Sequence, residues 1–369
     1  MTDFSLARPL DHRRRGLFGS LADFLCLGGG AFLALLVVAL LPVDTVAAPL
    51  ATAMLVVANF VNHPHFAHSY QIFYRGFSRR LRDPDVPARL RLRYAFAGIM
   101  VPLLLAGYFV AVILLRDPAG LGYALNFMGF VVGWHYVKQG FGIAMVDASF
   151  AGRFYADATR RAMLANGYAC WIYAWVESNR ALASRDLWGI ETGSFAFGAP
   201  VAYVAGAVFA LTSAWLLVCL VGDHRRHGRG FAVNGLVAYL VTLYAWVAFA
   251  RLDPLFVYVI PAMHSLQYLA VVWRFEINRV GDRTGNGAEG AGSARSRLAA
   301  FGIFGLVLGA AGFWILPLAL DRSVPYDHAL FGPNLFLFTF WIFINVHHYF
   351  IDNVIWRREN PEARRYLFA

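Results

Sequence analysis

The chain has 369 residues, of which 59% are hydrophobic and only 15% are charged, whereas about a quarter of the residues in a soluble domain carry a charge. This composition excludes an ordinary soluble domain and predicts an integral membrane protein. The net charge of +10 does not indicate a nucleic-acid partner, because the basic residues are spread along the chain and form no single basic patch.

Ten apolar stretches are each long enough to cross a bilayer at about 20 residues a span. The first follows an arginine-containing arm and has no small-residue cleavage site, so we interpret it as an uncleaved span. The sequence therefore predicts an all-α, polytopic membrane helix bundle that forms one domain over residues 1–369. An arm (1–16), a Gly-rich polar linker (276–297) and a tail (357–369) are predicted to lie in the cytoplasm. The predicted spans are 17–41, 46–70, 94–115, 121–145, 161–179, 196–221, 231–250, 253–273, 298–320 and 333–356.

Arginines alternate between the two ends of these spans. If the N-terminus is cytoplasmic, the inside segments hold 26 arginines and the outside loops hold 5. Cytoplasmic loops are enriched in Lys and Arg, so both termini are predicted to be cytoplasmic, as for a protein of a bacterial inner membrane. The inside segment 75–93 mixes arginines with leucines and is predicted to touch anionic lipid headgroups.

Seven histidines lie inside four of the predicted spans. All four spans run in the same predicted direction, and the polar residue at each inner end follows a histidine by 9 to 12 positions. This places the histidines at one level, about 13 to 18 Å from the inner boundary. Histidines inside a membrane are costly unless a partner compensates them, so we predict that all seven are ligands of a metal site. They are His63, His65, His68, His135, His264, His347 and His348.

Local sequence around these histidines adds detail. Pro64 cannot continue an ideal helix, so it is predicted to kink or unwind the chain and turn more than one neighbouring histidine toward the same point. Polar side chains three or four positions after a histidine share its helix face, one turn nearer the cytoplasm. We predict that they hydrogen-bond the ring nitrogens that do not face the metal. They are Gln139, Gln267, Tyr268 and Asp352.

Lys138 and Asp352 are the candidate catalytic residues. Lys138 is the only lysine in the chain and follows His135 by three positions. Its ammonium group either extends toward the cytoplasm or faces the site, as a charge partner for Asp352 or for an anionic group of the substrate.

Imidazole ligands without thiolates suit iron, copper, zinc or nickel, whereas magnesium and calcium require oxygen ligands. The three cysteines lie singly in separate apolar stretches and form no thiolate motif. Seven histidines exceed the needs of one structural zinc ion, which favours an open catalytic site or a dinuclear site. The alternative for any single histidine is a hydrogen bond between helices. A site buried in the inner leaflet implies a lipophilic small-molecule substrate.

An all-helical membrane chain whose polar cluster consists of histidines resembles the membrane-bound non-haem iron enzymes. These are the fatty-acid desaturase and hydroxylase superfamily and the Brp/Blh-type carotenoid dioxygenases. The stretches that carry the resemblance are H-P-H-F-A-H at 63–68 and H-H at 347–348, and their spacing differs from the H-x-x-x-H and H-x-x-H-H boxes of the desaturases. The resemblance implies mononuclear or dinuclear non-haem iron, an electron donor protein, and oxygen-dependent hydroxylation, desaturation or cleavage of a lipid or isoprenoid.

Two other functions fit the same residues. Axial histidines on facing helices, with an adjacent histidine pair for copper, also occur in haem and haem-copper electron-transfer proteins. Intramembrane histidines with Lys138 and Asp352 would also suit a metal-coupled or proton-coupled transporter. A transporter is expected to have repeated halves, and the sequence has no such repeat.

Overall fold

The computed structural model describes residues 16–181, 186–187, 190–227, 230–252, 256–284 and 288–368. Within these ranges the fold is helical apart from one antiparallel hairpin of two-residue strands, and single π-helical turns (η) join some of the α-helices. In chain order the elements are α1 (Ser20–Phe24), η1 (Leu25–Gly29), α2 (Gly30–Ala39), α3 (Val43–Phe60), α4 (Asn62–Tyr74), α5 (Phe77–Arg82), α6 (Ala88–Ala95), η2 (Phe96–Met100), α7 (Val101–Leu114), α8 (Pro118–Ala151), α9 (Asp157–Ala181), β1 (Asp186–Leu187), β2 (Ile190–Glu191), α10 (Ala199–His227), α11 (Val233–Leu240), η3 (Val241–Ala245), α12 (Trp246–Leu252), α13 (Phe256–Thr284), α14 (Ala288–Ala310), η4 (Ala311–Ile315), α15 (Leu316–Ser323), α16 (His328–Phe331), α17 (Leu335–Ile355) and α18 (Pro361–Leu367).

Long helical stretches occupy all ten predicted spans. Among the described residues, six of these stretches are long and apolar enough to cross a membrane, so the chain is a helical membrane protein. These six are Ser20–Ala39, Thr45–Tyr74, Ala88–Leu114, Ala199–Arg226, Gly292–Ser323 and Leu335–Ile355. Because α8, α9, α13 and the α11 to α12 stretch do not meet the same criterion, the count of ten spans stays a prediction.

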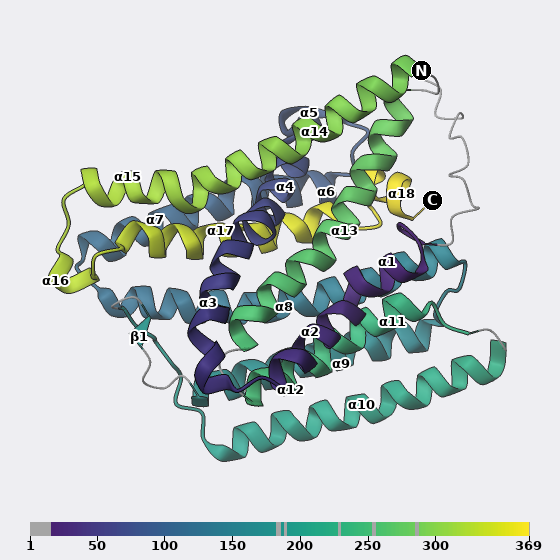
Figure 1. Cartoon of the computed structure of the whole chain (residues 1–369), viewed down its shortest axis with the longest axis horizontal. Helices are drawn as coiled ribbons and strands as arrows, with labels where there is room; N and C mark the ends of the chain where they lie inside the picture. Colours follow the sequence, from purple (N-terminus) through teal and green to yellow (C-terminus); the bar gives the residue numbers. More distant parts are fainter. Residues whose placement is uncertain are drawn as a thin grey trace.

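The ends of the helices form two separate groups. Figure 1 shows α8 and α17 running lengthwise through the molecule, with β1 and α16 at one end and α18 at the other. Ion pairs near α18 join segments that the arginine alternation places inside, whereas Arg116 and Asp327 pair two predicted outside loops. The inside pairs are Arg75–Glu276, Arg80–Glu362, Arg93–Glu359 and Arg365–Asp282. These pairs join segments that were predicted to share a side, and the full alternation and the assignment of one end to the cytoplasm stay predictions.

The predicted polar linker, 276–297, is mostly helical in the structure. Residues 276–284 continue α13 and residues 288–297 begin α14, so both sides of the segment are helical. The α13 side is held by a buried carboxylate, Glu276, which accepts hydrogen bonds from Arg75 and Arg279. Residues 285–287 and nearly all of the predicted arm 1–16 lie outside the described residues.

Pro64 interrupts its helix as predicted, but His63 and His68 stack on Phe313 and Phe301 and do not turn to one point with His65. The helix is interrupted at Val61, which has φ −121° and ψ −60° between α3 and α4. Proline has no N–H to donate to the carbonyl four residues earlier, here that of Phe60, so the break falls where that hydrogen bond would form. The interruption separates the largely exposed α3 from the buried histidine segment of α4.

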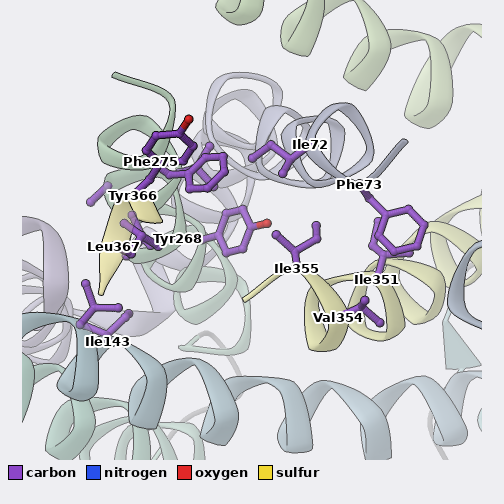
Figure 2. Close-up of a cluster of buried hydrophobic side chains, with 14 of the residues drawn as sticks. Ile72, Phe73, Ile143, Tyr268, Phe275, Ile351, Val354, Ile355, Tyr366 and Leu367 are labelled. Carbon is purple, nitrogen blue, oxygen red and sulfur yellow. The ribbon is translucent and has the colours of Figure 1, made fainter. Parts of the chain in front are cut away.

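An apolar cluster surrounds the inner ends of the helices. Figure 2 shows Ile351, Val354 and Ile355 of α17 with Ile72 and Phe73 of α4, beside side chains from α8, α13 and α18. Ile351 is fully buried. Such packing fixes the rotation of α4, α13 and α17 about their own axes, and hence the directions of their polar side chains.

Candidate metal centre

Four buried side chains converge from three helices: His65 of α4, His135 of α8, and His348 and Asp352 of α17. One donor atom of each lies within 4.8 Å of the corresponding atoms of the other three. Helix α17 supplies two of them because residues four positions apart share one face. None of the four is more than 5% exposed.

The inward-facing atoms of these side chains have no hydrogen-bond partner. His65 Nε2, His135 Nε2, His348 Nε2 and Asp352 Oδ2 are all buried and unpaired. Buried polar atoms nearly always have partners, and leaving one unpaired costs about 1 to 3 kcal/mol. A single cation could satisfy four such atoms together.

The spacing of these atoms fits a single metal ion. A metal–nitrogen bond is about 2.1 Å long, so two donor atoms on opposite sides of one ion are about 4.2 Å from each other. The observed limit of 4.8 Å exceeds this by a few tenths of an ångström, which small side-chain rotations can close. Three imidazoles and one carboxylate are a donor set suited to iron, zinc or copper.

Hydroxyl groups contact two of the four side chains at the atom that faces away from the other donors. Ser265 Oγ of α13 lies 3.0 Å from His65 Nδ1, so a metal on Nε2 would leave the Nδ1 proton to be donated to this serine. Tyr268 donates to Asp352 Oδ1 at 2.8 Å and itself accepts from Trp356 Nε1 at 3.2 Å. These contacts orient the donors in the way that outer partners of metal ligands do.

Asp352 takes a different position from the one predicted. We expected its carboxylate behind His348, accepting an N–H. Its free oxygen instead lies 3.4 Å from His348 Nε2 and 4.0 Å from His135 Nε2, beside nitrogens that also lack partners. This geometry favours a ligand over an orienting group, and Tyr268 occupies the predicted outer position.

His264 lies beside the four donors but outside their group. Its ring centroid is 5.0 Å from that of His135 and 5.3 Å from that of His65, and the ring stacks on Tyr136 at 4.0 Å. Neither of its nitrogens has a hydrogen-bond partner. His264 therefore adds two unpaired nitrogens beside the four donors.

The other three predicted histidines point elsewhere. His347 accepts from the Tyr70 hydroxyl at Nδ1 (2.8 Å) and donates from Nε2 to the Ala97 carbonyl (2.9 Å), which leaves no lone pair for a metal. His63 stacks on Phe313, and His68 stacks on Phe301. The predicted depth was a poor guide here because it does not specify the direction of a side chain around the helix.

Both predicted glutamines bind backbone carbonyls. Gln139 Nε2 donates to the carbonyl of His264 at 3.0 Å, and Gln267 Nε2 donates to the carbonyl of Leu27. They join α8 to α13 and α13 to η1, and so position the elements that carry the site. The sequence analysis missed Ser265 for two reasons. Its partner His65 lies on a different helix, and Ser265 follows His264 by only one residue, so the two do not share a helix face.

A cavity of about 730 Å³ reaches the site. His135, Tyr268, Tyr349 and Asp352 contribute to its lining, and so does Lys138. The lysine Nζ lies 6.0 Å from the centre of the Phe141 ring. Lys138 thus lines the cavity, which is compatible with both orientations considered for its ammonium group.

No family model, curated protein or solved structure matches this chain. Its class therefore follows from fold and site alone. It is a helical membrane protein in which three histidines and one aspartate form a buried group able to hold a metal ion.

Proposed function

We propose that the protein is a membrane-embedded, metal-dependent oxidoreductase, an oxygenase, hydroxylase or desaturase, that acts on a lipid or isoprenoid taken from the inner leaflet of a bacterial inner membrane. The observation that carries this proposal is the group of four unpaired donors, His65, His135, His348 and Asp352, at a cavity. A purely structural site would have no need of a cavity.

Non-haem iron suits this donor set best. A tetrahedral zinc ion bound by four protein ligands is closed and cannot take a substrate. Iron accepts five or six ligands, so the same four donors would leave positions open, as in iron sites built from histidines and one carboxylate. Bound iron would supply oxygen activation and electron transfer, with electrons from a donor protein.

The protein side chains have separate roles in this proposal. His65, His135, His348 and Asp352 hold the ion, and the partners Ser265 and Tyr268 orient two of them. The apolar walls of the cavity suit the lipophilic part of a substrate. Lys138 is the candidate catalytic cation, placed to bind or protonate a substrate group.

The compact donor group also bears on the haem alternative. A haem needs its axial ligands on opposite faces of a wide macrocycle, whereas four donors within 4.8 Å of one another leave no room for that ring between them. The resemblance to desaturases and carotenoid dioxygenases remains part of the proposal, as does the lipid substrate.

Metal analysis of the purified protein, together with its visible absorption spectrum, tests the proposal. We expect one iron per chain and no Soret band. Stoichiometric zinc without iron would contradict the redox function, and an intense Soret band would support the haem alternative instead.

A further inference from the structure

The cavity at the candidate metal centre extends from the buried histidines to the arginine-rich end of the molecule. At one end its lining includes His135 and Asp352, and at the other it includes Arg161 and Arg358. Both arginines are exposed, which identifies their end as the mouth. The cavity thus joins the site to the membrane surface that is predicted to face the cytoplasm.

Positive charge predominates along this cavity. Its basic lining residues are Lys138, Arg160, Arg161, Arg357 and Arg358, and its acidic ones are Asp157 and Asp352. Arg160 pairs with Asp157, Arg357 lies 3.4 Å from Glu359, and Asp352 belongs to the candidate metal centre. Among the described residues, no carboxylate lies within ion-pairing distance of Lys138. The remaining cations therefore favour an anion inside or at the mouth of the cavity.

The walls between these charges are apolar. Phe141, Ile143, Val146 and Val271 line the cavity between the histidines and the arginines. A volume of about 730 Å³ is within the range of sites that enclose a small organic ligand. A surface with cations at one end and apolar side chains beside them suits an amphiphile better than a neutral hydrocarbon.

We propose that the cavity binds an amphiphile whose anionic head group, a phosphate or carboxylate, is held by Lys138 and the arginines of the mouth. The apolar part then lies along the cavity walls toward the metal centre. Lys138 follows His135 by three residues of α8, about 4.5 Å along the helix axis. The reacting carbon is therefore near the head group and not at the far end of a long chain. Only this assignment of the reacting carbon rests on the proposed function.

Calorimetric titration of the full chain in a neutral detergent, with decyl phosphate as the probe, tests the binding. We expect Lys138→Gln and Arg161→Gln each to weaken binding by about fivefold, as for the loss of one partly exposed ion pair. Arg358→Gln should weaken binding by the same factor, and it should not affect folding because Arg358 is exposed. The matched control is Arg295→Gln, an exposed arginine of α14 outside the cavity lining, which should bind as the wild type does.

Two further probes test separately whether the apolar part and the negative charge of the ligand are needed for binding. Inorganic phosphate alone should bind at least tenfold more weakly than decyl phosphate, and equal binding would indicate a site for free anions. Decyltrimethylammonium should not compete, and equal binding would show that the cations have no role. Identical affinity for decyl phosphate in the Lys138, Arg161, Arg358 and Arg295 variants would overturn the proposal.

The same titration separates this inference from the metal-dependent function. Decyl phosphate should still bind to chelator-treated protein and to His348→Ala. If the wild type holds no metal yet binds the probe through these cations, the proposed function fails and the cavity assignment stands. If metal is bound but the probe is not, the inference fails and the metal centre stands.

Discussion

His347 and His348 are adjacent in sequence and differ completely in environment. Successive residues of a helix point about 100° apart, so the two rings leave α17 in different directions. His347 has both nitrogens in hydrogen bonds, whereas both nitrogens of His348 are unpaired and one lies 3.4 Å from Asp352. A histidine pair in a sequence therefore need not act as a pair.

The first prediction is that histidines of equal depth differ in metal binding. Replacing His65, His135 or His348 by alanine should lower bound metal at least tenfold, since changes to the outer partners of ligands alone cost about 10 to 100-fold. His347→Ala is the matched control from the next position and should retain the metal. The measurement is metal per chain by mass spectrometry, with thermal midpoints to confirm folding. Equal metal in all four variants would leave the histidines as helix contacts.

The second prediction concerns the hydroxyl behind Asp352. Tyr268→Phe keeps the ring in the apolar cluster and removes the hydroxyl that donates to Asp352 Oδ1 and also contacts Trp356 and Ser69. We expect a loss of about 10-fold or more in metal affinity, measured by competition with a chelator. Tyr366→Phe is the control, since its hydroxyl contacts Asp282 at 3.1 Å in the same cluster. Loss of thermal stability with unchanged metal affinity would assign Tyr268 a structural role.

At the residue scale, the sequence could predict the depth of the site along the helices, but it could not predict which histidines belong to the group of four donors. The spacing of His348 and Asp352 predicted a shared face because it lies within one helix. Selection among His63, His65 and His68 depends on the break at Val61 and on the rotation of α4 against α14. Such rotations arise from packing between helices distant in sequence, which periodicity does not contain.

At the scale of elements, the contact between α4 and α14 depends on small residues. Gly305 and Gly309 form a G-x-x-x-G pattern, which lets two helices in a membrane approach closely. A Cβ at Gly309 would lie 3.0 Å from the His63 carbonyl carbon, and one at Gly305 would overlap the His68 ring. This contact explains why His63 and His68 face α14 while His65 faces the site.

The third prediction tests this helix contact. Gly309→Ala must push α14 away from the backbone of α4, and overpacking of this kind costs about 1 to 3 kcal/mol. The control is Gly129→Ala on α8, where the new methyl would meet nothing within 4 Å. Thermal midpoints in detergent measure both. A lower midpoint for Gly309→Ala with no decrease for Gly129→Ala is expected, and equal midpoints would contradict the close contact.

The positions of the long helices could be predicted, since each apolar stretch of sufficient length lies on a helix. The linker 276–297 could not, because its glycines and charges are typical of a loop. In the structure Glu276 is buried between Arg75 and Arg279, and Asp282 pairs with Arg365 of α18. The pairs with Arg75 and Arg365, which come from outside α13, support helix where local composition disfavours it.

At the scale of the whole molecule, the fourth prediction is topological. Reporter fusions after Arg93 and Arg365 should read cytoplasmic, and fusions near Arg116 and Asp327 should read external, because arginines collect on the cytoplasmic side. The pair Arg116–Asp327 lies at the end opposite α18, so these fusions probe both ends of the molecule. A cytoplasmic reading at Arg116 would reverse the orientation of the cavity.

The basic mouth of the cavity affects the loading of the metal as well as the binding of an anion. A divalent cation that enters past Arg161, Arg357 and Arg358 is repelled, whereas an anionic amphiphile is attracted. Salt screens both effects over a Debye length of about 8 Å at physiological ionic strength. Added salt should therefore speed metal uptake by this route while it slows capture of the amphiphile, so the two cargoes would respond to ionic strength in opposite directions.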